Sequence, residues 1–152
     1  AAEQREVFES ILEDTLGAGC SIEVAQAIHD QLSSQIREHR ESKSTEPLIV
    51  TAGEIGKVLL ACGVTEENVA AFQVQCGERF GVGAVLDPAN LIDPGKYEVK
   101  TAQATIQVDP EFSYAVTTRV IDGRAYLLLP ADDIQVNGLP IQVTNGQETE
   151  TI

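Results

Sequence analysis

The chain has 152 residues, 43% of them hydrophobic, and carries 24 acidic against 10 basic residues for a net charge of −14. This length suits one domain or two small ones packed together, with enough apolar material for a core that needs no metal or disulfide. The acidic excess repels nucleic-acid phosphates and anionic membranes, so the sequence predicts no nucleic-acid partner and no membrane partner.

Cys20, Cys62 and Cys76 are odd in number and widely spaced, unlike the dense, even sets of secreted disulfide scaffolds. We expect all three to be unbridged and to act as small buried hydrophobes on helices. No apolar run is long enough to cross a membrane and no signal segment opens the chain, which predicts a cytoplasmic location. The lack of Met suggests a piece excised from a longer protein.

Helical periodicity dominates the first part of the chain. Apolar residues recur at helical spacing over residues 3–16, and a second stripe over 21–40 can be capped by Ser21, so a helical hairpin is predicted. The polar stretch 41–46 reads as a linker. A capping box at Thr51 and Glu54 predicts a helix to Cys62, and Thr65 begins another that ends near Gly81.

Beyond Gly95 the hydrophobic period changes from 3.6 to 2. The alternation slips near Ala102 and Gln103, which suggests a bulge or bend. Asp122-Gly123 and Asn137-Gly138 are signals for two hairpins with type I′ turns. The first hairpin is expected to turn one face to the core. That face comprises Val116, Thr118, Val120, Ala125, Leu127 and Leu129.

The other face of this hairpin holds the candidate binding residues Arg119, Arg124 and Tyr126. Tyr126 lies opposite Arg119, where a cation–π contact is feasible. Such a face is either simply solvated or docks an acidic surface. Residues 1–94, with 16 acidic and 6 basic residues, offer one such surface.

Patterns that carry catalysis are weak. Gly53 to Lys57 fails the spacing of a phosphate loop, and His29 and His39 lie too far apart on one helix to share a metal. The pair Asp132 and Asp133 is read as a solvated turn in preference to an acid–base site. We therefore expect no cofactor and no metal site, and no catalytic residue can be named.

Three stretches nevertheless resemble a known family: residues 47–57, 96–101 and 118–126, the last running on to Asn137-Gly138. Over residues 47–141 the chain resembles the C-terminal part of an uncharacterised family of clostridia-type bacteria, a domain of unknown function. The resemblance implies a bacterial cytosolic protein more than twice this length. It implies no activity and no site.

The sequence thus predicts an α+β fold, with N-terminal helices packed on a C-terminal antiparallel sheet built from hairpins. We expect a helical hairpin over 1–46, an α+β domain over 47–143 and a flexible tail over 144–152. The favoured function is an interaction or structural module that contacts a protein partner or the rest of its parent chain. The alternative is a non-nucleotide enzyme, for example a hydrolase, with a pocket between helices and sheet.

Overall fold

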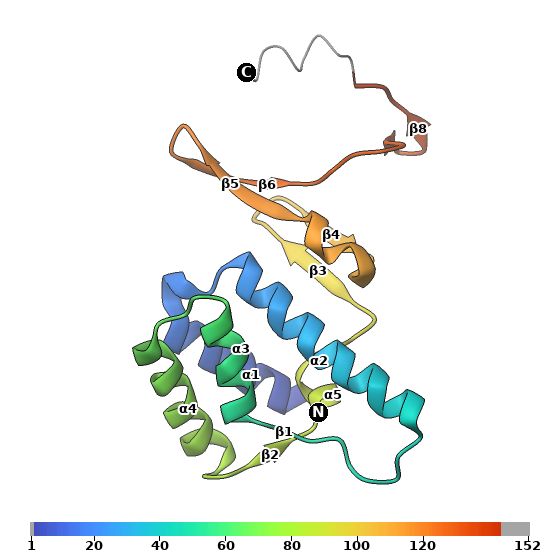
Figure 1. The fold of residues 1–152 in the computed structure, drawn as a ribbon. Coiled ribbons are helices and arrows are strands. Elements are labelled where there is room, and N and C mark those ends of the chain that lie inside the picture. The colour runs from blue at the N-terminus through green and yellow to red at the C-terminus, as the bar shows by residue number, and fades with distance from the viewer. Residues whose placement is uncertain (1, 144–152) are drawn as a thin grey trace. The chain divides into compact units, whose positions relative to one another are not determined.

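The computed structural model of the protein describes residues 2–143 (Figure 1). The predicted tail over 144–152 lies outside the described residues. The chain divides into two compact units, one up to Tyr114 and the other from Ala115 onward.

Four helices make up most of the first unit, and local capping explains where three of them begin. Helix α1 spans Ala2–Leu16, and a 3₁₀ turn at Gly17–Gly19 separates it from α2 at Ile22–Ser42. The Ser21 side chain accepts a hydrogen bond from the Val24 backbone N–H and so caps α2. Both helices of the predicted helical hairpin are present, whereas their pairing as a hairpin stays a prediction. The C-cap residue of α2, Lys43, has the left-handed conformation.

The next two helices follow the predicted caps. Helix α3 spans Ala52–Ala61 and is capped by Thr51, while α4 spans Glu66–Phe80 and is capped by Thr65. Strand β1 (Val50–Thr51) precedes α3 and strand β2 (Val85–Leu86) follows α4, and the two strands pair antiparallel. The short helix α5 (Pro88–Leu91) follows β2. The pairing places the start of α3 beside the segment that leaves α4.

The helices enclose one hydrophobic core. Phe8 of α1 and Phe72 of α4 meet edge to face with ring centroids 6.3 Å apart, and both are buried. Helix α2 contributes Val24, Ile28 and Leu32 to the same cluster. The domain boundary predicted at residue 46 stays a prediction, although the segments it separates share this core.

The first unit also holds a β-hairpin. Strand β3 (Tyr97–Lys100) pairs antiparallel with β4 (Thr105–Val108), and a 3₁₀ segment spans Pro110–Ala115. The Thr101 hydroxyl accepts hydrogen bonds from the backbone N–H groups of Gln103 and Ala104. The expected bend at Ala102 and Gln103 is therefore present, and it is the reversal of a hairpin, not a bulge.

The second unit contains the two hairpins that the turn signals predicted. Strand β5 (Thr117–Ile121) pairs with β6 (Arg124–Leu128), and β7 (Gln135–Val136) pairs with β8 (Leu139–Pro140). Asp122 and Gly123 have φ angles of 52° and 77°, as a type I′ turn requires. The described strands form four separate two-stranded antiparallel sheets, one of them β1–β2.

Two sequence expectations about burial are wrong. Of the six residues expected to face the core, Val116 is buried and Leu127 half-buried, whereas the other four are exposed; Val120 is 70% exposed. Alternation shows which side chains share a face, but burial needs a second layer over that face. Cys20 is also exposed, because the 3₁₀ turn leaves it outside the apolar stripe of α2.

The predicted fold class is confirmed: N-terminal helices are followed by C-terminal antiparallel hairpins in an α+β chain. The unbridged state of the cysteines is confirmed as well. Cys76 is buried and Cys62 half-buried, as a small hydrophobe on a helix would be.

Candidate functional site

The β5–β6 hairpin presents the predicted binding residues on one face. Arg119 lies directly opposite Tyr126, and Arg124 opposite Ile121, as the turn at Asp122-Gly123 dictated. All four side chains are exposed, and the structure records no cation–π contact among residues 2–143. The hairpin thus brings two guanidinium groups and two large apolar side chains together at a solvated face. We call Arg119, Ile121, Arg124 and Tyr126 the arginine face.

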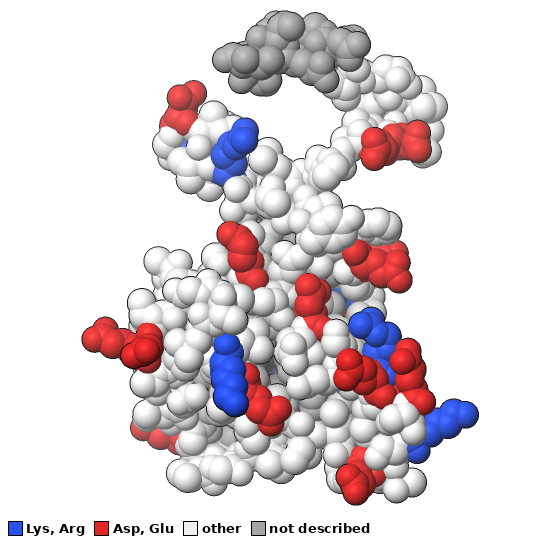
Figure 2. Space-filling model, viewed as in Figure 1, with Lys and Arg blue, Asp and Glu red and all other residues white. Residues whose placement is uncertain are grey.

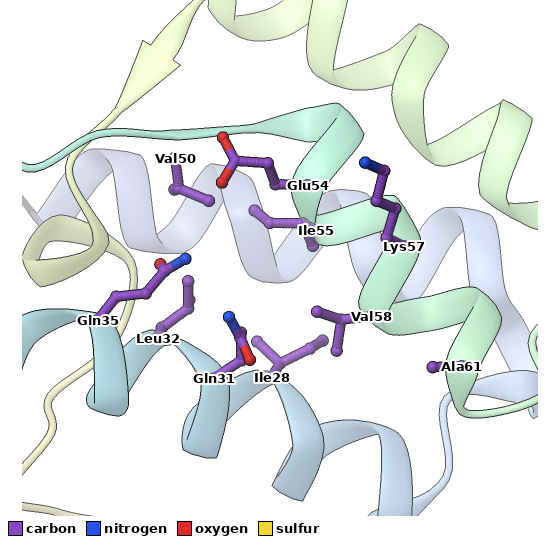
Figure 3. Close-up of a pocket in the computed structure, with 10 residues that line it drawn as sticks. All are labelled: Ile28, Gln31, Leu32, Gln35, Val50, Glu54, Ile55, Lys57, Val58 and Ala61. Atoms are coloured by element: carbon purple, nitrogen blue, oxygen red, sulfur yellow. The ribbon is translucent and has the colours of Figure 1, made fainter.

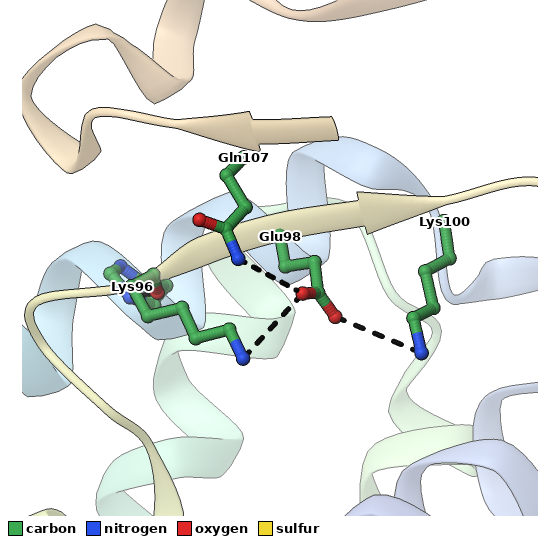
Figure 4. Close-up of polar contacts among 5 residues, drawn as sticks. Lys96, Glu98, Lys100 and Gln107 are labelled. Atoms are coloured by element: carbon green, nitrogen blue, oxygen red, sulfur yellow. Dashed lines mark hydrogen bonds and ion pairs between the residues drawn. The ribbon is translucent and has the colours of Figure 1, made fainter. Parts of the chain in front are cut away.

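The lysines at the β3–β4 hairpin differ from the arginines of the arginine face, because a carboxylate is paired with them. At β3–β4, Lys96 and Lys100 lie on either side of Glu98, with Nζ atoms 3.5 and 4.0 Å from its carboxylate oxygens (Figure 4). Gln107, opposite Glu98 on the neighbouring strand, donates a further hydrogen bond of 3.5 Å. Strands β5 and β6 contain no carboxylate at all. The charges of the arginine face therefore have no partner within its own strands.

Sequence reasoning missed the Glu98 cluster. Residues 96, 98 and 100 alternate along an extended segment and so share a face, a signal that the period of two would have revealed.

The first unit is strongly acidic. Residues 1–114 contain 19 acidic and 8 basic residues, and Figure 2 shows carboxylates scattered over the helical surface on the side drawn. Both ion pairs recorded among the described residues involve Glu98, so most of these carboxylates face solvent without a cation. The first unit of this chain therefore presents an acidic surface.

His29 has a structural place. It is buried, and its Nε2 lies 3.0 Å from the Asp93 carbonyl oxygen and 2.8 Å from that of Lys96. Since both neighbours are acceptors, Nε2 carries a proton and donates it, while Nδ1 forms a hydrogen bond of 3.3 Å with the Ser33 hydroxyl. His29 therefore fastens α2 to the turn before β3.

The other candidates for chemistry stay apart from one another. His39 binds the Glu46 carbonyl oxygen through Nε2 at 2.6 Å. Asp132 and Asp133 lie exposed in a bend, as the sequence suggested, with Asp133 at a φ of 54°. Within residues 2–143, no three His, Cys, Asp or Glu side chains gather in a way that could hold a metal ion.

A groove between α2 and α3 has a volume of 350 Å³ (Figure 3). Its floor is apolar, with Ile28, Leu32 and Ile55, and the Gln35 side chain carries a buried Oε1 that has no hydrogen-bond partner. Glu54 at the rim accepts a hydrogen bond from the Thr51 hydroxyl. The groove suits a small apolar group and lines up no nucleophile with a base. The described residues thus offer no observation in favour of the hydrolase alternative.

Fold and surface together define an α+β domain with a helical core and exposed hairpins, in which no catalytic constellation is recognised among the described residues. The chain belongs to the family described as Domain of unknown function (DUF4317), whose model matches residues 1–139. The match extends to the first residue and so includes the helices over 1–46, which the resemblance seen in the sequence had left out. Neither the comparison with curated proteins nor that with solved structures gave a match.

Nothing in the family description assigns an activity. Among the described residues, no helix is both long enough and apolar enough to cross a membrane.

Proposed function

We propose that this chain is an interaction module whose arginine face binds an acidic protein surface, on a partner protein or on the rest of its parent chain. The observation that carries the proposal is the exposure of that face. Two arginines without a carboxylate on their own strands flank the large apolar side chains of Ile121 and Tyr126. Arginine and tyrosine are the residue types in which binding energy at protein interfaces concentrates.

The marginal stability of isolated hairpins supports the same proposal. A two-stranded hairpin has little independent stability in water, and β5–β6 buries little of its own apolar surface. Docking another surface covers these side chains and stabilises the strands. Charge also favours docking on an acidic surface, because guanidinium groups pair with carboxylates through two parallel hydrogen bonds.

The proposed setting is a cytoplasmic protein of clostridia-type bacteria, in which the chain forms the C-terminal part. The stretches 47–57, 96–101 and 118–126 support this placement through the resemblance that they carry. The acidic excess supports a protein partner over nucleic acid or an anionic membrane. The proposed module works without a cofactor.

A short fluorescein-labelled oligo-glutamate peptide tests the arginine face by fluorescence anisotropy. Because the chain as a whole repels such a peptide, binding requires a local cationic surface. We expect saturable binding at low salt that weakens roughly tenfold or more when Arg119 and Arg124 are replaced by Glu, and that weakens likewise in about 0.5 M salt.

The matched control is the double replacement of Lys96 and Lys100 by Glu, since these cations are already paired with Glu98. It should reduce binding far less than the arginine variant. The proposal is wrong if the wild-type chain does not bind the peptide, or if both double variants lose binding equally.

A further inference from the structure

The open edges of the β5–β6 hairpin differ in what they can pair with. The described sheet contains only these two strands, so each strand has one edge without a neighbour. Natural proteins protect such edges with charges, prolines or bulges, because an open apolar edge pairs readily with another strand. Each strand carries one charge. In β5 the charge is Arg119 at the centre, whereas in β6 it is Arg124 at the start, and Tyr126 lies at the centre.

The turn geometry fixes which backbone groups face outward. In a hairpin closed by a two-residue turn, Ile121 and Arg124 form a hydrogen-bonded pair, and bonded and non-bonded pairs then alternate along the strands. The non-bonded pairs are Val120 with Ala125 and Thr118 with Leu127. The backbone N–H and C=O groups of Ala125 and Leu127 therefore point away from β5, at the open edge of β6.

We propose that β6 pairs antiparallel with β6 of a second copy of this chain, which joins two hairpins into one four-stranded sheet. With Tyr126 opposite Tyr126 of the second copy, Ala125 of each copy lies opposite Leu127 of the other. This register uses both outward-facing residues of each strand and forms four backbone hydrogen bonds. It is a two-fold symmetric contact, in which the same edge serves both copies.

Charge selects β6 over β5 for this pairing. A symmetric contact centred on β5 places Arg119 directly opposite Arg119, and like charges in that position destabilise a sheet. On β6 the symmetric register places aromatic rings opposite each other and Arg124 opposite Leu128, so no like charges meet. Aromatic cross-strand pairs stabilise a sheet. The edge of β6 is thus self-complementary, and the edge of β5 is not.

This inference rests on the proposal that the hairpin is an interaction surface and names one occupant for its edge. Edge pairing leaves the arginine face open. In the four-stranded sheet, Arg119 and Arg124 of both copies lie on one continuous face, which doubles the cationic surface presented to an acidic partner.

Proline substitution at the edge tests the pairing with a matched control. Ala125→Pro replaces the outward N–H of Ala125 at the β6 edge by the proline ring. Val120→Pro is the control, because Val120 is the cross-strand partner of Ala125 and its N–H points outward at the β5 edge. Both residues are exposed, so neither substitution removes a buried side chain. Sedimentation velocity from about 0.01 to about 1 mM covers weak, small interfaces.

We expect the wild type and Val120→Pro to shift from monomer toward dimer across this range, and Ala125→Pro to dimerise at least tenfold more weakly. Oligo-glutamate binding by Ala125→Pro shows that its arginine face is still formed. The inference is overturned if the wild type stays monomeric up to about 1 mM, or if both proline variants lose dimerisation equally. A monomeric wild type that still binds oligo-glutamate refutes the pairing and leaves the proposed function standing.

Discussion

The two units of this chain carry similar apolar residues and use them differently. In the first unit, Ile11, Leu59 and Phe72 are fully buried between helices. In the second, Val120 and Leu139 are exposed by 70% and 66%. Among the described residues after Tyr114, Val116 is the only buried hydrophobic residue. Hydrophobicity and regular spacing thus provide an apolar face, while a facing layer decides whether that face becomes a core.

The difference in burial predicts that the helical core is more stable than the β5–β6 hairpin. Helices α1, α2, α3 and α4 each bury a stripe against the others, so their unfolding is expected to be cooperative. The β5–β6 hairpin has little apolar burial of its own to oppose the conformational entropy of its strands. It therefore opens at a lower free energy than the helical core does.

The strongest test of the comparison is a pair of core and hairpin truncations. Phe72→Ala removes a buried ring that packs against Phe8 and should destabilise the first unit by roughly 3–5 kcal/mol. Val120→Ala removes an exposed side chain and should change the same transition by less than about 0.5 kcal/mol. Denaturant melts followed by helical circular dichroism measure both. Equal effects would show that the two units do not differ as described.

The turn between β5 and β6 gives a test of intermediate size. Gly123 has a φ of 77°, where a β-branched residue is strained, so Gly123→Val should disfavour the hairpin by roughly 1–3 kcal/mol. Asp122→Asn is the control, because Asn-Gly is also a favoured type I′ turn. Amide hydrogen exchange in β5 and β6 should speed up in the first variant only. Loss of protection in α1–α4 as well would contradict the separation of the units.

The smallest expected effect lies within the helical unit and concerns its thiols. Burial raises the pKa of Cys76 to about 11, since an apolar environment disfavours the thiolate. Partial burial of its thiol also raises the pKa of Cys20, but its side chain is exposed. At pH 8 a thiol reagent should therefore modify Cys20 faster than Cys76, which should react only after unfolding. Mass spectrometry of the labelled chain separates the two sites. Rapid labelling of Cys76 in the folded chain would show that the helical core is looser than described.

The raised pKa of Cys76 also makes the stability of the folded chain depend on pH. Above about pH 9 the thiol of the unfolded chain loses its proton, whereas the folded chain keeps that proton until about pH 11. The folded state then binds more protons than the unfolded state. The contribution of Cys76 to stability consequently falls as the pH rises through this interval, and Cys76→Ala should flatten the decline.

Much of the local structure followed from the sequence. Ser21, Thr51 and Thr65 cap the helices that they were expected to begin, because a side-chain oxygen at that position satisfies a free backbone N–H. Asp122-Gly123 fixed a hairpin register in which Arg119 faces Tyr126. Such features depend on residues only a few positions apart, so short-range rules suffice to predict them.

Other features depend on distant contacts, and here the sequence rules were insufficient. The fastening of His29 to carbonyl groups more than 60 residues away left no local signal. The reversal at Ala102 and Gln103 read as a bulge or bend, since the same slip in alternation arises whether a strand kinks or folds back on itself.

Neighbouring residues set the order of helices and hairpins, the helix caps, the type I′ turns and the residues that share each strand face, so all of these could be predicted from the sequence. The enclosure of Phe72, the exposure of Val120 and the hydrogen bonds of His29 to distant carbonyl groups depended on how the chain packs. Burial and long-range hydrogen bonds depend on what lies opposite a side chain in space. Residues far apart in the chain provide those neighbours, so no local pattern records them.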